Sequence, residues 1–181
     1  MSVLRLFVGI ELPESLKQLL AELREDYPGA RWHEPEQYHL TLNFIGGVSE
    51  EHAQRIAAAL EGVSSSHFTL AVQGVGYFGT SQRPSILWAG LAPSVPLYQL
   101  QKTVEQRLLP LGLMVEDRPY TPHITLARVK REVPLPVFLQ RHAQLSLPAF
   151  QVDHICLFLS SGGDQGVRYE VVERFRLSKP V

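Results

Sequence analysis

The tetrapeptides HLTL and HITL, at residues 39–42 and 123–126, repeat the same order of residue types in one chain. Each alternates histidine and threonine with aliphatic residues. Because successive side chains of an extended strand point to opposite faces, histidine and threonine share one face and the aliphatic residues share the other. Each copy therefore offers an imidazole and a hydroxyl group side by side, anchored by aliphatic side chains behind them.

Brought together, the two copies form a site with the imidazoles of His39 and His123 and the hydroxyls of Thr41 and Thr125. An unperturbed imidazole has a pKa of about 6.5, so one ring can be charged while the other is neutral. One ring can then take a proton from water while the other gives a proton to a leaving oxygen. The hydroxyls can hold the non-bridging oxygens of a phosphodiester. This set suits in-line displacement at phosphorus.

The elements expected around the two tetrapeptides follow the same order in both halves of the chain. After a first strand at 2–12, the first half has a helix, the motif strand, a helix and two strands: 13–27, 38–47, 49–62, 66–78 and 84–91. The second half repeats this order at 94–112, 118–129, 135–145, 150–161 and 167–177. Residues 28–37, with two prolines, are expected to form a loop.

This repetition predicts an α+β fold with two lobes. His39 and His123 lie 84 residues apart, close to half of the 181-residue chain. We expect one bilobal domain over 1–181, with pseudo-symmetric lobes of antiparallel sheet at about 1–92 and 93–181 and strands free to exchange between them. Helices lie outside in this arrangement, and the active cleft lies between the lobes.

Composition narrows the class of protein. A hydrophobic content of 45% and a charged content of 19% are typical of a globular chain. The net charge of −1 provides no overall attraction to nucleic acid, so phosphate binding must be local. A single cysteine, Cys156, excludes an internal disulfide and a CxxC metal site. We expect a cytoplasmic monomer with no signal peptide, membrane span or cofactor.

The segments RLFVGIELP, HLTLNFIGGV, ILWAG and RPYTPHITLAR resemble the bacterial and archaeal RNA 2′,3′-cyclic phosphodiesterases, also called 2′-5′ RNA ligases, of the 2H phosphoesterase superfamily. The resemblance implies the bilobal 2H phosphoesterase fold and a metal-independent site. It also implies that His39 is the proton donor to the leaving ribose oxygen and that His123 is the proton acceptor that activates water. Thr41 and Thr125 would bind the phosphate oxygens. Arg128 is a further phosphate-binding candidate, although a straight strand would point it elsewhere.

The expected reaction is hydrolysis of an RNA terminal 2′,3′-cyclic phosphate to a 2′-phosphate, with reversible 2′-5′ RNA ligation at the same site. RNA ends or small cyclic nucleotides are the expected substrates, and no membrane partner is expected. One alternative is a non-catalytic nucleotide- or RNA-binding module on the same fold, although binding alone needs no pair of proton-transfer groups. Another is a metal-dependent hydrolase with histidine ligands, which the scarcity of nearby acidic or cysteine ligands disfavours.

No catalytic role is assigned to the residues beside the motifs. His33 falls in the loop before the first motif, where exposure to solvent is expected. Strict alternation from His39 places Asn43 in the cleft and Phe44 in the core unless the strand bulges. Trp88 and Tyr120 could stack on a base, but aromatic residues in strands usually belong to the core.

Overall fold

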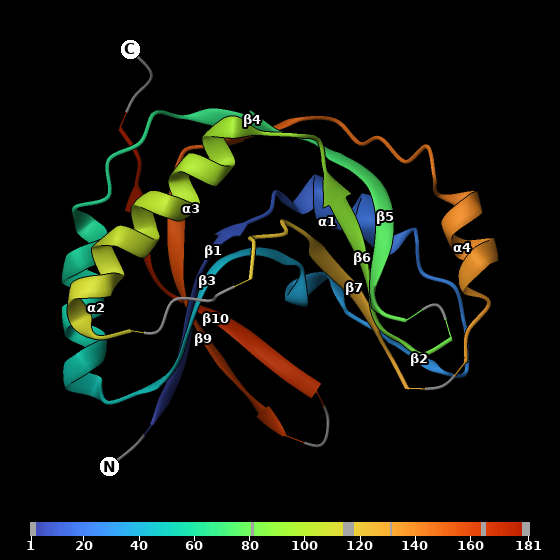
Figure 1. The fold of residues 1–181 in the computed structure, drawn as a ribbon, viewed down its shortest axis with the longest axis horizontal. Coiled ribbons are helices and arrows are strands. Elements are labelled where there is room, and N and C mark those ends of the chain that lie inside the picture. Colours follow the sequence, from blue (N-terminus) through green and yellow to red (C-terminus); the bar gives the residue numbers. More distant parts are fainter. Residues whose placement is uncertain (1–2, 81, 114–117, 131, 164–165, 179–181) are drawn as a thin grey trace.

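A computed structural model describes residues 3–80, 82–113, 118–130, 132–163 and 166–178, and two four-stranded antiparallel sheets form its frame (Figure 1). The first sheet contains, in spatial order, β10 (Gly166–Arg176), β9 (His154–Gly163), β1 (Leu4–Glu11) and β3 (His39–Val48). The second contains β2 (Ala30–Trp32), β7 (Ile124–Val129), β6 (Pro84–Leu91) and β5 (Val72–Gly79). A smaller pair joins β4 (Phe68–Leu70) to β8 (Phe150–Val152). Each four-stranded sheet thus takes strands from both halves of the sequence.

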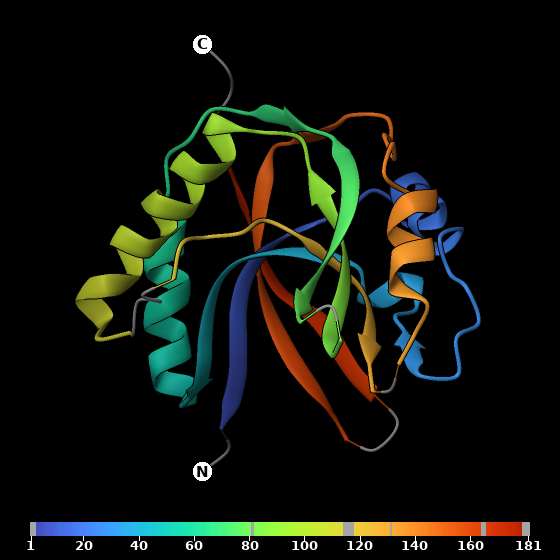
Figure 2. The same cartoon turned by 45° about the vertical axis from the view of Figure 1, so that its right-hand side comes forward.

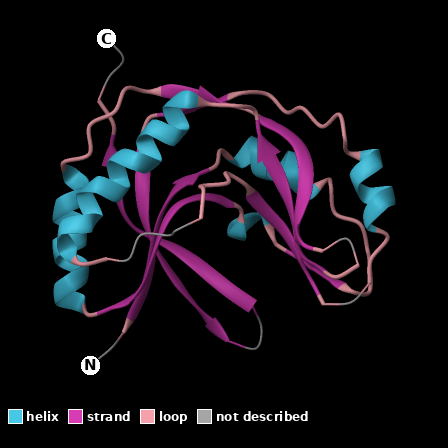
Figure 3. Ribbon diagram, viewed as in Figure 1, coloured by secondary structure: helices cyan, strands magenta, loops and turns pink. Residues whose placement is uncertain are grey.

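The helices are α1 (Glu14–Ala21), α2 (Glu50–Glu61), α3 (Val95–Leu108) and α4 (Leu135–Arg141), with short 3₁₀ turns η1 (Pro35–Gln37) and η2 (Leu109–Leu111). In Figure 3 the helices α2 and α3 lie at one side of the molecule and α4 lies at the other, with the strands and α1 between them. The helices α2 and α3 contact each other, and they pack on β10 and β3 of the first sheet. The helix α4 lies beside the second sheet (Figure 2). Over the described ranges, no helix has the length and apolar character needed to cross a bilayer.

The aliphatic residues of the two tetrapeptides belong to the main hydrophobic core. Leu40, Leu42, Ile124 and Leu126 are each at most 3% exposed. Burying a side chain of this size contributes roughly 1.5–3 kcal/mol. The apolar stripes of α2 and α3 pack into the same core through Ile56, Leu60, Leu97, Leu100, Val104 and Leu108. The predicted α+β class, with antiparallel sheets and outer helices, is therefore confirmed.

Several boundaries differ from those expected from the sequence. The helix expected at 13–27 ends at Ala21, and the strand expected at 118–129 begins at Ile124, directly after His123. The expected loop at 28–37 contains β2 and η1, because Ala30–Trp32 pairs with β7. The strand expected at 66–78 is divided at Ala71 into β4 and β5, which pair with β8 and β6. The strand expected at 150–161 is likewise divided at Asp153 into β8 and β9. The alternation of apolar and polar residues continues across each break, so the sequence does not reveal it. Which sheet a segment joins depends on the strand with which it pairs.

Charged groups connect three strands of the first sheet at one end. The guanidinium group of Arg174 on β10 donates two hydrogen bonds, of 2.7 and 3.1 Å, to the carboxylate of Glu11 on β1. On β9, Nε2 of His154 lies 2.6 Å from Oε1 of Glu11. Nδ1 of the same ring lies 2.6 Å from the carboxylate of Asp153. The hydrogen bond from Arg174, with a smaller contribution from His154, lowers the pKa of Glu11 to about 2 despite partial burial.

We expect the substitution Glu11→Gln to lower the free energy of unfolding at pH 7 by about 1–2 kcal/mol, since it removes a charge-assisted pair that solvent partly screens. The pKa of Glu11 is lower in the folded chain than its ordinary value of 4.5. Its stabilising contribution is therefore complete above that value and is lost as the pH falls towards 2. Urea unfolding at pH 7 and pH 3 measures the difference.

The matched control is Glu170→Gln, which removes an exposed carboxylate from β10. It should change the free energy of unfolding by less than about 0.5 kcal/mol. If Glu11→Gln destabilised the protein equally at both pH values, the effect would not come from the ionised carboxylate.

Candidate active site

The structure brings the two tetrapeptides together where the two sheets meet. The strand β3 carries His39 and Thr41. It contacts β7, which begins directly after His123 and carries Thr125. The hydroxyl of Tyr120 donates a hydrogen bond of 2.7 Å to the backbone carbonyl of Thr41. This bond joins the segment that leads into the second tetrapeptide to the strand that carries the first.

Both histidine rings are held in the same way by the backbone. Nδ1 of His39 lies 2.8 Å from the carbonyl oxygen of Gln37, and Nδ1 of His123 lies 2.8 Å from that of Thr121. Because a carbonyl oxygen only accepts, each Nδ1 carries a hydrogen, and Nε2 of the neutral ring is an acceptor. Nε2 of His39 is 3.0 Å from Oγ1 of Thr41, whose hydroxyl therefore donates to it. Each ring thus offers Nε2 for proton transfer.

Aromatic side chains surround both imidazoles. The His39 ring lies 4.8 Å from the ring of Phe7 and 4.6 Å, edge-on, from that of Tyr169. The His123 ring meets the Phe78 ring edge-on at 4.7 Å. Apolar neighbours of this kind fix the ring positions and replace water around them, which disfavours the charged form of each imidazole.

The pKa values of the two histidines show this effect. Burial lowers the pKa of His39 to about 4; the hydrogen bond to Gln37 opposes this shift, whereas the nearby His123 and Lys17 add to it. Burial also lowers the pKa of His123, and its hydrogen bond to Thr121 opposes the shift. At neutral pH both rings are therefore uncharged in the absence of an anion. The two rings belong to segments that the contact between β3 and β7 brings together.

A β-bulge occurs at the fourth residue of both tetrapeptides. On β1 and β3, Gly9 pairs with Thr41 and Val8 pairs with Asn43, so Leu42 is an extra residue. On β6 and β7, Trp88 pairs with Thr125 and Leu87 pairs with Ala127, so Leu126 is the extra residue. A bulge of this kind shifts the alternation of side chains by one position.

The two bulges return the fifth residue after each histidine to the face of that histidine. Phe44 is 65% exposed, and its ring lies 6.2 Å from that of Phe7. Arg128 acts on the hydroxyl of Tyr169, first through its charge and then through hydrogen bonding, and so opposes the rise that burial causes in the pKa of that tyrosine. The placement of Asn43 expected from strict alternation is wrong, because Asn43 shares the face of the fully buried Val8.

Two residues set aside in the sequence are parts of the site. Tyr120 is half-buried and donates the hydrogen bond to Thr41 described above. His33, expected in solvent, is only 8% exposed. Its backbone N–H donates a hydrogen bond to the carbonyl of Leu126, which continues the pairing of β2 with β7. Burial, followed by the charges of His39, Arg128 and Arg31, lowers the pKa of His33 to about 4. The strand β2, at Ala30–Trp32, is too short for its alternation to have served as a sequence signal.

One group of side chains within the described ranges has the composition of a metal site: Glu11, His154 and Cys156, whose ligand atoms lie within 4.8 Å of one another. The carboxylate of Glu11 is already bound by Arg174 and His154. Burial raises the pKa of the Cys156 thiol to about 12, which disfavours the thiolate that a metal needs. These residues do not fit a metal centre.

Comparison with known proteins gives a consistent result. Residues 6–164 match the 2′-5′ RNA ligase superfamily. The chain is 32% identical to an RNA 2′,3′-cyclic phosphodiesterase of Geobacillus stearothermophilus. The match covers 94% of this chain and 56% of the length of that protein. It is 29% identical to an RNA 2′,3′-cyclic phosphodiesterase of Methanocaldococcus jannaschii, over 95% of this chain and 100% of that protein.

The fold is also found among solved structures. The structure of E. coli LigT complexed with 3′-AMP has a TM-score of 0.80 and 26% sequence identity, and the match covers 98% of this chain and 99% of that one. The two sheets, the outer helices and both motif strands lie within this matched length. The chain belongs to the 2′-5′ RNA ligase superfamily.

Proposed function

We propose that the protein hydrolyses the 2′,3′-cyclic phosphate at an RNA end to a 2′-phosphate, without a metal ion. The observation that carries this proposal is the pair of imidazoles, each with Nδ1 bonded to a carbonyl two residues earlier and Nε2 available. The names of the relatives in Geobacillus and Methanocaldococcus support the same reaction. The nucleotide in the LigT structure supports a nucleotide as the substrate class.

In the proposed reaction, the cyclic phosphate lies between the two Nε2 atoms. His123 takes a proton from water, whose oxygen forms a bond to phosphorus. The bond from phosphorus to the ribose 3′-oxygen breaks, and His39 gives this oxygen its proton. Thr41 and Thr125 donate hydrogen bonds to the non-bridging oxygens, while Arg128 contributes positive charge near the phosphate.

The bond between Thr41 and His39 changes role when the substrate binds. In the free protein the Thr41 hydroxyl donates to Nε2 of His39, a bond that requires the neutral ring. A phosphodiester anion between the rings raises the pKa of His39, and the protonated Nε2 no longer accepts. The Thr41 hydroxyl is then free to donate to a phosphate oxygen. Substrate binding therefore favours protonation of His39 and, at the same time, frees the Thr41 hydroxyl to bind the phosphate.

The same groups can catalyse 2′-5′ RNA ligation when an RNA 5′-hydroxyl takes the place of water. His123 would then deprotonate this hydroxyl, and the cyclic phosphate would again open towards the 3′-oxygen. The two activities share every residue named above and differ in which nucleophile reaches the phosphorus. A non-catalytic binding module, the other reading of this fold, would bind cyclic phosphates and leave them intact.

We expect His39→Ala and His123→Ala each to lower turnover of an RNA with a 2′,3′-cyclic end by at least about 10²-fold, because each removes one proton-transfer group. Gel separation of the products and their assignment as 2′-phosphates measure the reaction. The control is His52→Ala on α2, whose ring bonds to the carbonyl of Leu111 away from the site. Near-normal turnover in either motif variant, with its fold intact, would remove that residue from the mechanism.

A substrate that needs no proton on its leaving group distinguishes the two roles. A p-nitrophenyl phosphodiester releases a stable anion, so the loss caused by His39→Ala should shrink at least about tenfold on this substrate. The loss caused by His123→Ala should remain, since water must still be deprotonated. The opposite pattern would exchange the assigned roles.

The dependence of the rate on pH should differ between free and substrate-bound protein. The lowered pKa values of His39 and His123 imply that kcat/KM, which reports the free protein, has its optimum below pH 6.5. Because the substrate anion raises both pKa values, the optimum of kcat should lie at higher pH. Steady-state rates from pH 4.5 to 9 provide both profiles. A kcat/KM optimum at or above that of kcat would rule out this explanation.

Turnover should persist in excess EDTA, because the reaction as proposed uses two imidazoles, two hydroxyls and a guanidinium group. Assays after prolonged incubation with the chelator, followed by addition of Mg²⁺, Mn²⁺ or Zn²⁺, test this expectation. Activity lost with EDTA and restored by one of these ions would favour the metal-dependent alternative.

A further inference from the structure

Two arginines of the second sheet lie directly opposite each other on neighbouring strands. Arg31 on β2 is the register partner of Arg128 on β7. Directly opposed residues of antiparallel strands have Cβ atoms about 4.5–5.5 Å apart, and like charges at such positions destabilise the sheet. Among the described residues, no carboxylate forms an ion pair with either arginine. The pair thus has an unfavourable electrostatic energy that a bound anion would reverse.

Both arginines reach across to β10 of the first sheet. The charge of Arg128 acts on the hydroxyl of Tyr169, whose ring packs edge-on against His39. Nη2 of Arg31 lies 2.8 Å from the position that a Cβ atom would take at Gly166. The side chain of Gln37 fixes this part of β10 by donating a 2.8 Å hydrogen bond to the carbonyl of Val167. The two arginines therefore lie along β10, Arg128 beside Tyr169 and Arg31 beside Gly166.

A buried histidine completes this group. His33 is only 8% exposed, and its Nδ1 has no hydrogen-bond partner within the described part of the chain. It interacts electrostatically with Arg31, Arg128 and His39. A buried polar atom left without a partner is costly, and such atoms in native proteins usually meet a ligand or water. At neutral pH this ring is uncharged, and it lies beside the two positive guanidinium groups with one nitrogen unpartnered.

We infer that Arg31 and Arg128 form a second phosphate subsite, which binds the phosphodiester that joins the terminal nucleotide to the rest of the RNA. The inference rests on the function proposed above. Guanidinium groups fit this ligand because their planar forks bind phosphate oxygens in pairs. The substrate class it predicts is an RNA chain of at least two nucleotides, rather than a free cyclic mononucleotide.

The proposed roles of the histidines give the subsite its position along the RNA. His39 protonates the leaving ribose oxygen, so the terminal ribose lies on the His39 side of the phosphorus. Tyr169 links this side to Arg128, and Arg31 lies beyond it. A strand rises about 3.3 Å per residue, so Arg128 begins roughly 7–10 Å along β7 from Thr125. Arg128 therefore stands between the two phosphates and serves both, whereas Arg31 on the edge strand β2 serves only the second.

Three substrates isolate the second phosphate: 2′,3′-cyclic AMP, the dinucleotide ApA with a 2′,3′-cyclic end, and the same dinucleotide with an uncharged methylphosphonate linkage. We expect kcat/KM for the charged dinucleotide to exceed that for the mononucleotide by at least about tenfold. The methylphosphonate should lose most of this preference, because it keeps the second nucleoside but not the charge. Equal values for the charged and neutral dinucleotides would overturn the inference.

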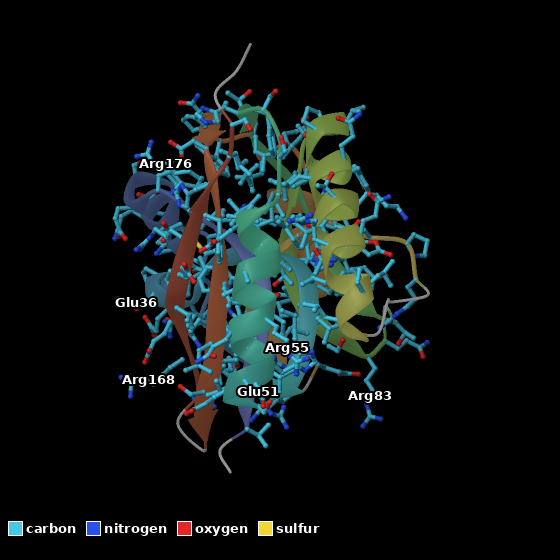
Figure 4. All side chains as sticks on the ribbon, turned by 90° about the vertical axis from the view of Figure 1, so that its left-hand side faces the viewer. Glu36, Glu51, Arg55, Arg83, Arg168 and Arg176 are labelled. Atoms are coloured by element: carbon cyan, nitrogen blue, oxygen red, sulfur yellow. The ribbon has the colours of Figure 1, made fainter. Side chains whose placement is uncertain are left out.

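The variant Arg31→Gln tests the residue itself. It should reduce the ratio of dinucleotide to mononucleotide kcat/KM by about tenfold, and Arg31→Lys, which keeps the charge without the fork, should restore part of it. The matched control is Arg55→Gln on the outer surface of α2 (Figure 4), which should leave the ratio unchanged. Because Arg31→Gln removes a like-charge contact, its thermal midpoint should not fall. A ratio unchanged in Arg31→Gln would overturn the inference.

A binding measurement separates the subsite from the proposed reaction. The dinucleotide ApA with a 2′-phosphate end is the product, so its dissociation constant can be measured at several salt concentrations without turnover. Loss of one phosphate contact lowers the slope of log Kd against log salt by about 0.7, which is the change expected for Arg31→Gln. Identical slopes would exclude the subsite. If no cyclic substrate is cleaved but the slopes differ, the proposed reaction fails and the subsite stands.

Discussion

The complete burial of Leu40 and Ile124 fixes the position of the two imidazoles. Both side chains are 0% exposed, and each directly follows a motif histidine in the chain. Because neighbouring strand residues point to opposite faces, a one-residue slip of either strand would bury an imidazole and expose an aliphatic side chain. Such a slip would cost several kcal/mol in lost apolar burial alone. The ring tautomers, the threonine positions and the contacts with aromatic rings all depend on this register.

Much of this arrangement could be predicted from the sequence, because it follows from local periodicity. The two motif strands, the apolar faces of α2 and α3, and the pairing of histidine with threonine on one face all come from patterns a few residues long. The bulges at Leu42 and Leu126 could not be predicted, since they arise from the register with β1 and β6. They decide that Arg128 lies on the face of Thr125, which alternation alone does not imply.

The burial of His33 and the pairing of β2 could not be predicted from the sequence either. A three-residue strand has too few positions to show a period, and the two prolines near it favoured a loop. Its pairing with β7 is a long-range contact, which no local pattern encodes. The same holds for Tyr120, whose hydrogen bond to Thr41 joins segments far apart in the chain. Local chemistry was thus predictable, whereas the contacts that bring the two motifs together were not.

The bulge at the fourth position of each tetrapeptide has a consequence for the direction of the reaction. A site built from two equivalent halves would accept a cyclic phosphate in either of two opposite orientations, with the histidines exchanging tasks. The bulges place different residues at equivalent positions: an exposed aromatic ring, Phe44, and a cation, Arg128. Only one orientation brings the charged backbone of an RNA to the cation. The symmetry of the two strands supplies the catalytic pair, and this single difference between them gives the site its polarity.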